Sequence, residues 1–226
     1  MKRSKRYLEQ VKDVDTSKVY SIDEAVEILK NVQPKVKFDE TVEVNLSLNV
    51  DPRKPDQLIR GAVVLPHGLG KEMRVVVICS GEAERAAKEA GADYVGGKDI
   101  IEKIAGGWLD FDSVIATPDM MRELSKLGRL LGPRGLMPSP KTGTVTQDVA
   151  KAVKEVKAGR VEFKTDKQGC INAGVGKISF PKEHLVENIG FFIDKVKELR
   201  PQAVKGLLIK KAYVSTSMGP GLRVAV

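Results

Sequence analysis

Residues 41–50 read Thr-Val-Glu-Val-Asn-Leu-Ser-Leu-Asn-Val, with apolar and polar side chains alternating at every step. Because successive side chains of a strand point to opposite faces, this alternation predicts a strand with one buried face and one wet face. Such strands are typical of an antiparallel sheet that helices cover on one side. The one-sided pattern returns near the end of the chain, in strands predicted at 161–166, 170–180, 207–215 and 222–226.

A different pattern occupies the middle of the chain. Residues 74–79 read Arg-Val-Val-Val-Ile-Cys, a continuous apolar run that predicts a strand buried on both faces. The elements predicted after it are helix 82–90, strand 94–95, helix 99–105, strand 113–117, a helix from Pro118 to about Leu127 and helix 148–158. Strands that alternate with helices indicate right-handed βαβ units around a parallel sheet.

The two patterns predict a fold that combines α+β and α/β domains. We expect residues 1–66 and 160–226 to form one discontinuous α+β domain, and residues 67–159 to form an inserted, Rossmann-like, three-layer α/β domain. The chain of 226 residues is long enough for two small cores. Within the first segment, Ser21 and Glu24 have the spacing of a capping box and predict the start of a helix.

The charge of the chain is unevenly distributed. Lys and Arg number 38 against 30 Asp and Glu, which gives a net charge of +8 and a pI of about 9.4. Residues 1–66 carry +1 and residues 67–150 carry −1, so the whole excess lies in residues 151–226. Lysine can serve solubility alone, but a one-signed surplus also suits a polyanion such as a nucleic acid. Aromatic residues make up only 5% of the chain, so a base-stacking platform is poorly supplied.

Several classes of protein are excluded by composition. Two cysteines rule out a disulfide-rich scaffold, and two histidines leave little for a zinc site, so we expect no metal and no cofactor. No stretch approaches the roughly 18 apolar residues of a membrane span. Residues 1–6 are basic, but Tyr7-Leu8-Glu9-Gln10 follows where a signal peptide would be apolar. We therefore expect a cytoplasmic protein without a membrane partner.

The sequence shows no catalytic constellation. The first turn after a buried strand, Cys79-Ser80-Gly81-Glu82-Ala83, lacks the glycine pattern of a dinucleotide site, and no Walker A pattern occurs. Cys79 ends an apolar strand, which favours a buried and inert thiol. We therefore expect no enzyme and no catalytic residues. An α/β enzyme that acts on an anionic substrate between two domains stays open as an alternative.

Three loops could contact a polyanion. Residues 131–143 form a rigid basic loop, which is either a structured linker or a phosphate contact through Arg134 and Lys141. Residues 215–221, Ser-Thr-Ser-Met-Gly-Pro-Gly, offer hydroxyls, a methionine and glycines that permit close approach of a backbone; a plain tight turn is the alternative. His67 lies at the domain junction and would serve either as a hinge residue or as a phosphate contact.

Four separated motifs resemble those of the bacterial ribosomal protein L1 family. They are Lys37-Phe38-Asp39-Glu40-Thr41-Val42-Glu43, Leu65-Pro66-His67-Gly68, Gly132-Pro133-Arg134-Gly135-Leu136-Met137-Pro138 and Ser217-Met218-Gly219-Pro220, and Lys5-Arg6-Tyr7 also matches. The resemblance covers essentially the whole chain. It implies a structural protein of the large ribosomal subunit, in the cytoplasm, that binds a folded junction of rRNA and forms the mobile stalk. It also implies help in the release of deacylated tRNA from the exit site, and translational repression through the protein's own mRNA.

The resemblance also assigns RNA-binding residues and leaves a competing interpretation. The implied contacts are Lys37, Phe38, Thr41, His67, Lys167, Ser217, Met218 and Gly219. Ser217 departs from the family, which often has threonine there; the hydroxyl is kept and the methyl group is lost. We expect a monomer when the protein is free of RNA. A general nucleic-acid-binding module, such as a DNA-associated regulator, is the third interpretation.

Overall fold

The computed structural model describes residues 3–12, 14–34 and 36–226, so the first two residues of the basic start of the chain lie outside the described part. The chain divides into two compact units. Unit 1 combines the segment up to Gly70 with Val161–Val226, and unit 2 is Lys71–Arg160. The sequence-based insert, 67–159, covers nearly the same residues as unit 2; that the two parts are independent domains stays a prediction.

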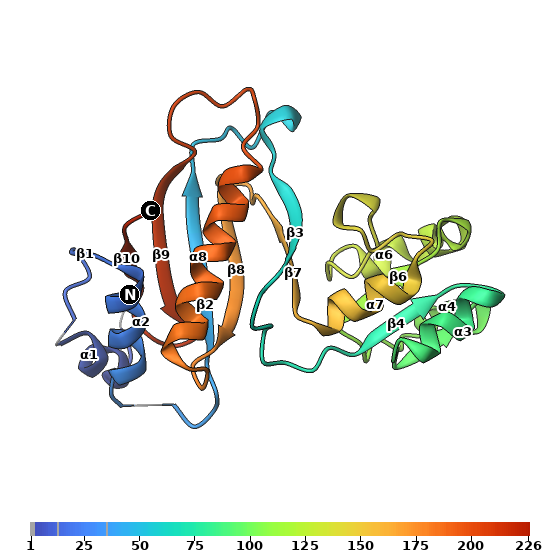
Figure 1. The fold of residues 1–226 in the computed structure, drawn as a ribbon, viewed down its shortest axis with the longest axis horizontal. Helices are drawn as coiled ribbons and strands as arrows, with labels where there is room; N and C mark the ends of the chain where they lie inside the picture. Colours follow the sequence, from blue (N-terminus) through green and yellow to red (C-terminus); the bar gives the residue numbers. More distant parts are fainter. Residues whose placement is uncertain (1–2, 13, 35) are drawn as a thin grey trace. The chain divides into compact units, whose positions relative to one another are not determined.

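A five-stranded sheet forms the centre of unit 1, in the order β1-β10-β9-β2-β8 (Figure 1). The strand β2 (Thr41–Leu48) pairs antiparallel with β8 (Cys170–Lys177) on one side and with β9 (Ile209–Thr216) on the other. β10 (Leu222–Val224) pairs antiparallel with β9, and β1 (Val19–Tyr20) pairs in parallel with β10. The strands predicted at 41–50, 170–180, 207–215 and 222–226 are thus confirmed; each is shorter than predicted, and β9 ends one residue later, at Thr216.

The alternation along β2 decides which face of this sheet is buried. Its four apolar side chains are buried and its four polar side chains are partly exposed. The helices α2 (Ile22–Asn31) and α8 (Lys182–Glu198) pack against each other and against strands of the sheet. Each large apolar side chain buried fully in this layer contributes about 1.5–3 kcal/mol relative to exposure. Turning β2 over would therefore be very costly, which fixes its polar face outward.

Of the two helices near the N-terminus, the sequence predicted one and missed the other. The capping box of α2 is confirmed, because the Ser21 hydroxyl accepts from the Glu24 N–H at 3.2 Å and the Ser21 N–H donates to Glu24 Oε2 at 3.2 Å. The helix α1 (Lys5–Lys12) was not predicted. It carries few apolar side chains, and only Gln10 is buried, so hydrophobic periodicity gave no signal for it.

A separate two-stranded sheet lies at the edge of unit 1. It consists of β3 (Arg60–Val64) and β7 (Arg160–Lys164), preceded by the short η1 (Pro55–Gln57). The Phe163 ring packs edge-on against Phe192 of α8, with ring centroids 5.3 Å apart. This contact joins the small sheet to the apolar core of unit 1.

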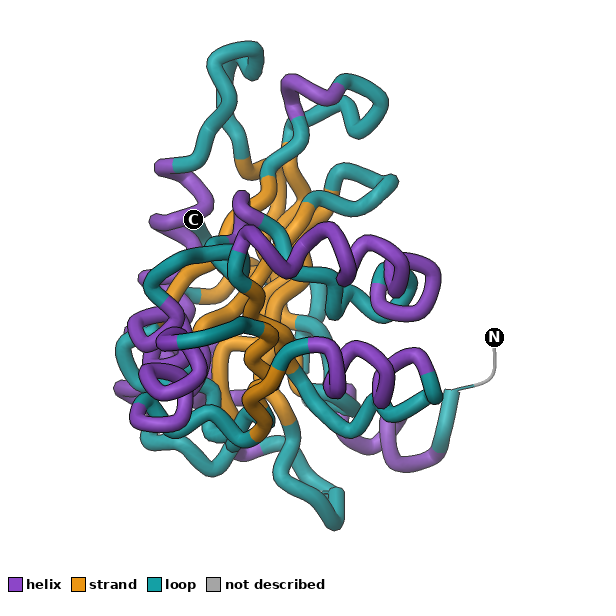
Figure 2. Tube along the Cα trace, turned by 90° about the vertical axis from the view of Figure 1, so that its right-hand side faces the viewer, coloured by secondary structure: helices purple, strands orange, loops and turns teal. Residues whose placement is uncertain are grey.

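Three connections gather at the end of the sheet where β2 stops. The Leu48 N–H donates to the Gly169 carbonyl at 3.0 Å, and the Asn49 N–H donates to the Leu208 carbonyl at 2.7 Å. Figure 1 shows the loops after β2 and after α8 at this same end, and Figure 2, turned by 90°, shows loops above the upper ends of the strands. The opposite end of the sheet therefore carries the start of β2 and the end of β9.

Unit 2 is a three-layer α/β fold around a parallel sheet. β4 (Val75–Ile78) lies between β5 (Tyr94–Gly96) and β6 (Ser113–Ala116) and pairs in parallel with both. Every side chain of β4 is fully buried, as its apolar run predicted. Val75 and Val77 belong to one core cluster, and Val76 and Ile78 belong to the cluster on the other face.

Helices cover both faces of this sheet. α3 (Glu82–Glu89) and α7 (Val149–Lys157) contribute to one core cluster, and α4 (Lys98–Ala105) contributes to the other. The prediction of one continuous helix from Pro118 to about Leu127 is wrong. The structure has the short turns η2 (Pro118–Met120), α5 (Met121–Leu124), η3 (Ser125–Leu127) and α6 (Gly128–Leu131), and later η4 (Pro140–Thr142). The Ser125 hydroxyl donates to the Met121 carbonyl at 2.7 Å, a contact that competes with regular helix geometry.

Candidate nucleic-acid interface

The start of β2 and the turn after β9 meet at one end of the open sheet face. Val42 is paired with Thr216, so the next residue outward on each strand, Thr41 and Ser217, are neighbours. The Ser217 N–H donates to the Thr41 carbonyl at 3.0 Å, and the Thr41 N–H donates to the Ser217 hydroxyl at 3.2 Å. Two segments that are 176 residues apart in sequence thus form one surface.

Glu40 holds this surface together from beneath. Its side chain is buried, and its Oε1 atom accepts from the Met218 N–H at 2.8 Å and from the Thr216 hydroxyl at 3.2 Å. Sequence reasoning missed Glu40 as a site residue. The sequence did offer one signal: Glu40 directly precedes Thr41, which is the first residue of the predicted strand and a predicted RNA contact.

Two apolar side chains beside this contact are presented to solvent. Phe38 is 52% exposed and Met218 is 49% exposed, and Lys37 is exposed next to Phe38. Arg6 of α1 donates to the Met218 carbonyl at 3.4 Å, so a cation also lies at the turn. The arrangement combines hydroxyls, bare backbone, two apolar contacts and positive charge. These are the groups that read the shape and the sugar edges of a folded RNA.

Lys177 is a second residue that sequence reasoning missed. It ends β8 opposite Thr41, and its ammonium group donates to the Thr41 hydroxyl at 2.9 Å and to the Asp39 carbonyl at 3.4 Å. The Asp39 carboxylate is itself occupied, because it accepts from the Ser179 N–H at 3.2 Å and from the Ser179 hydroxyl at 2.8 Å. The segment 38–41 is therefore fixed on both sides before any partner binds.

Position 219 has no room for a side chain, which explains why it is a glycine. A Cβ atom at this position would lie 2.3 Å from Thr216 Oγ1, which is far inside van der Waals contact. Thr216 Oγ1 cannot move freely, because it donates to Glu40. A side chain at 219 would therefore displace the hydroxyl that helps to hold the turn.

The structure does not bring every predicted RNA contact to this surface. Lys167 is exposed in the turn between β7 and β8, at the end of the sheet where β2 stops. The seven steps from Thr41 to Leu48 span about 23 Å at ~3.3 Å per residue, so Lys167 is separated from Thr41 by the length of β2. As an RNA contact it stays a prediction, and it requires an interface as long as the sheet.

His67 also lies apart from the turn. Its Nε2 atom is 2.6 Å from Glu187 Oε2, and its ring stacks on His184 of α8 with centroids 3.9 Å apart. The His67 N–H donates to Asn188 Oδ1 at 3.2 Å. His67 is therefore held against α8, which explains its place at the junction without RNA; its role as an RNA contact stays a prediction.

The basic loop 131–143 is ordered by its own contacts. Thr142 and Thr144 are buried, the two hydroxyl oxygens are 3.0 Å apart, and the Ser139 N–H donates to Thr144 Oγ1 at 2.9 Å. Arg160 donates to the Thr142 carbonyl. These bonds account for the loop as a structured linker. Arg134 and Lys141 stay exposed on it.

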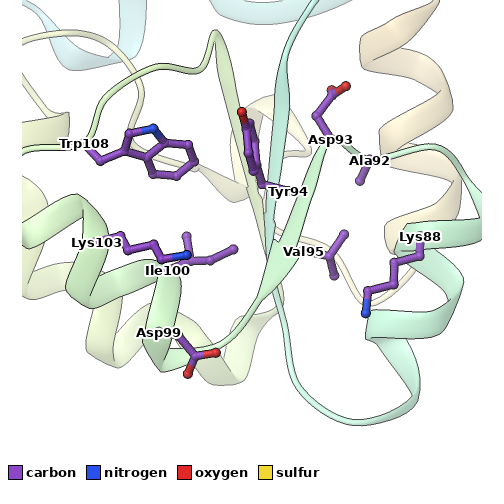
Figure 3. Close-up of a pocket in the computed structure, with 9 residues that line it drawn as sticks. All are labelled: Lys88, Ala92, Asp93, Tyr94, Val95, Asp99, Ile100, Lys103 and Trp108. Carbon is purple, nitrogen blue, oxygen red and sulfur yellow. The ribbon is translucent and has the colours of Figure 1, made fainter.

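Unit 2 contains a cavity that a small molecule could fill. The cavity has a volume of about 540 Å³ and lies beside β5. Figure 3 shows the Tyr94 and Trp108 rings next to each other in its lining; they pack edge to face, with ring centroids 4.7 Å apart. Its lining residues include no serine, cysteine or histidine, so a nucleophile and base pair of the Ser–His or Cys–His type is absent there.

Other chemistry is equally sparse in the described part of the chain. Cys79 is buried, and desolvation raises the pKa of its thiol, which suppresses the reactive thiolate. Among residues 3–12, 14–34 and 36–226, no group of three or more acidic, histidine or cysteine side chains is arranged for a metal ion. No described helix has both the length and the apolar character needed to cross a bilayer.

Fold and site together define a two-unit α/β protein with a preformed polar surface suited to nucleic acid. Residues 28–220 match the model of the family described as "Ribosomal protein L1p/L10e family". The chain is 58% identical to "Large ribosomal subunit protein uL1" of Persephonella marina, covering 100% of this chain and 94% of that protein. It is 53% identical to the uL1 protein of Thermus thermophilus, covering 99% and 97%. The chain belongs to the ribosomal protein L1 family, and it is a structural protein and not an enzyme.

Proposed function

We propose that this protein is a structural constituent of the large ribosomal subunit, in the cytoplasm, and that it anchors itself there by binding a folded junction of rRNA. The observation that carries the proposal is the Thr41–Ser217 contact, with Glu40 fixing the Met218 backbone beneath it. A surface ordered before binding loses little conformational entropy when RNA arrives. The match to uL1 relatives over nearly the full chain supports the same role.

The resemblance also motivates two finer roles. A surface that recognises a folded junction would bind a similar fold in the protein's own mRNA, and so would repress its translation. Unit 2 would act on the motion of the stalk and on release of deacylated tRNA from the exit site, because most of the net charge, +6 of +8, lies in unit 1. We expect the free protein to be a monomer.

The central proposal is tested by binding of the full-length protein to an rRNA fragment that contains the junction. Duplex DNA of equal length serves as competitor, and the titration is repeated at several salt concentrations. We expect a preference for the rRNA junction that persists as salt rises, whereas a general nucleic-acid-binding module would lose its preference.

A matched pair of variants locates the site. Met218→Ala should weaken binding, and Leu130→Ala, which truncates a 41% exposed side chain in unit 2, should leave it unchanged. Equal affinities for both variants would contradict the proposed site. No preference of the parent protein for the rRNA would contradict the proposed function.

A further inference from the structure

A cavity of about 350 Å³ opens beside the proposed RNA-binding surface. Its lining residues are Gln10, Leu29, Lys30, Val32, Val36, Phe38, Asp39, Glu40, Ile178, Ser179, Thr216 and Pro220. Phe38, Asp39 and Ser179 are exposed and form its mouth, whereas Gln10 and Glu40 are buried and form its floor. The cavity therefore leads inward from the aromatic ring that is presented next to the 217–219 turn.

The floor of the cavity offers hydrogen-bond acceptors. Gln10 is 4% exposed, and its Oε1 atom is buried without a hydrogen-bond partner among the described residues. The orientation of this amide is set, because Nε2 donates to the Pro34 carbonyl at 2.9 Å and a carbonyl can only accept. On Glu40, both hydrogen bonds arrive at Oε1, which leaves Oε2 able to accept another.

The charged side chains Lys30 and Asp39 around the cavity already have protein partners. Lys30 donates to the Phe180 carbonyl, and the Asp39 carboxylate accepts both hydrogen bonds from Ser179. The unpartnered Gln10 oxygen is therefore the group in the floor that a ligand would satisfy, by donating a hydrogen bond to it. A buried acceptor without a partner is costly, so a donor at this position is favoured.

We propose that this cavity receives one unpaired nucleobase of the bound RNA, an adenine, cytosine or guanine whose exocyclic amino group donates to Gln10 Oε1 and Glu40. The inference rests on the proposed function. Specific recognition of RNA commonly uses bases splayed out of junctions, stacked on aromatic rings and hydrogen-bonded at their edges. Phe38 supplies the ring, and its exposure at the mouth of the cavity follows from this role. Uracil offers a single ring N–H donor in place of an amino group with two N–H bonds, so we expect it to bind less tightly.

Occupancy of the cavity would also be coupled to the turn. Glu40 lines the cavity, and its Oε1 atom accepts from the Met218 N–H. A base that donates to Glu40 therefore acts on the same carboxylate that fixes the 217–219 turn. This gives the protein a way to recognise a particular unpaired base as well as the shape of the junction.

The test fills the cavity without touching the proposed RNA contacts. Val36→Phe places a phenyl ring in it, and Ile28→Phe is the matched control, because Ile28 lines a second cavity that also contacts Gln10. Gln10→Leu removes the acceptor at similar volume and serves if Val36→Phe does not fold by circular dichroism. We expect Val36→Phe to weaken binding of the rRNA fragment by about 5- to 150-fold, the range for loss of one stacked base. The control should bind as the parent does.

Chemical probing identifies the base. Dimethyl sulfate and kethoxal modify the accessible Watson–Crick edges of unpaired adenine, cytosine and guanine. At saturating protein, the parent and Ile28→Phe should protect one unpaired base that stays reactive with Val36→Phe. Full affinity and unchanged protection with Val36→Phe would show that the cavity holds solvent only, and would overturn the inference. Absence of any specific binding by the parent protein would instead contradict the proposed function.

Discussion

The Oε1 atom of Glu40 accepts the backbone N–H of Met218 at 2.8 Å, across 178 residues of sequence. This bond places a buried carboxylate directly beneath the exposed turn that we assign to RNA. Negative charge close to a phosphate is unfavourable, so this part of the surface is suited to sugar and base edges. The cations nearby, including Lys37 and Arg6, are then left for phosphate contacts.

The bond predicts a specific order of effects at position 40. Glu40→Ala should weaken rRNA binding by about 1.5–3 kcal/mol, the usual contribution of a hydrogen bond to a charged group, because the turn loses its anchor. Glu40→Gln keeps an acceptor oxygen and should retain more affinity than Glu40→Ala. Both variants are compared by titration with the rRNA fragment. Equal losses would mean that the anchor for Met218 is not what binding needs.

Gly219 yields a prediction with an internal rescue. Gly219→Ala should weaken rRNA binding by distorting the turn, since the new Cβ would lie 2.3 Å from Thr216 Oγ1. Thr216→Ala removes that oxygen, so the double variant should recover part of the lost affinity. Binding by the four proteins of this cycle gives the coupling energy, and we expect about 0.5–3 kcal/mol in the direction of rescue. Additive losses would place the requirement for glycine outside this contact.

If both ends of the sheet bind RNA, Lys37 at one end and Lys167 at the other should contribute independently to the affinity for RNA. Lys37→Ala should make the dependence of log affinity on log salt shallower by about one unit or less, and Lys167→Ala should do the same. Because the length of β2 separates the two ends, their effects should add in the double variant. Met218→Ala should lower affinity at constant slope. A Lys167→Ala protein that binds as the parent does would confine the interface to the end near Thr41.

Unit 2 should lose stability in acid because of one carboxylate. Hydrogen bonds from Lys71 and Arg74 lower the pKa of Asp112 from 3.8 to about 2, and its side chain is 17% exposed. A lowered pKa stabilises the folded state above about pH 4, and this stabilisation is lost as the pH falls towards 2; it amounts to about 2 kcal/mol. Asp112→Asn should destabilise unit 2 at neutral pH and flatten this acid-side decline. Fluorescence of Trp108, which lies in unit 2, follows the unfolding.

The control for this prediction is Asp99→Asn. Asp99 is exposed and forms no ion pair within 4.0 Å among the described residues, so its replacement should leave the acid profile unchanged. The same steep decline in Asp112→Asn as in the parent would assign the acid sensitivity to other groups.

Removal of unit 2 tests the division of labour between the two parts. Residues 67–70 belong with unit 1, because Asn188 bonds to both His67 and Gly68 and Gly70 lies against Phe180. We therefore delete residues 71–159 and join Gly70 to Arg160 through a short Gly/Ser linker, which β3 and β7 permit as neighbours in one sheet. The product should fold and keep most of the specific rRNA affinity. A folded product without that affinity, or specific binding by residues 71–160 alone, would contradict the proposed anchoring role of unit 1.

The sequence by itself determined the two sheets and their different exposure. Strict alternation in residues 41–50 leaves only one way to bury the apolar side chains of β2, and the apolar run ending at Cys79 requires cover on both faces. The same patterns predicted a discontinuous domain formed by residues 1–66 and 160–226 and an inserted domain formed by residues 67–159. The residues that resemble the L1 family also marked Phe38, Thr41 and the 217–219 turn as candidate contacts.

Only the tertiary structure decided how those residues combine. The pairing of β2 with β9 brings Thr41 to Ser217, and no local pattern specifies which strands become neighbours, because that choice depends on packing of the whole core. Glu40 and Lys177 acquired their roles through contacts with residues far away in sequence, and Lys167 was separated from them by the length of a strand. The helix α1 carries too few apolar side chains to give a periodic signal, yet it places Gln10 in the floor of the cavity. Burial of a polar side chain is a property of the assembled fold, so the sequence could not reveal it.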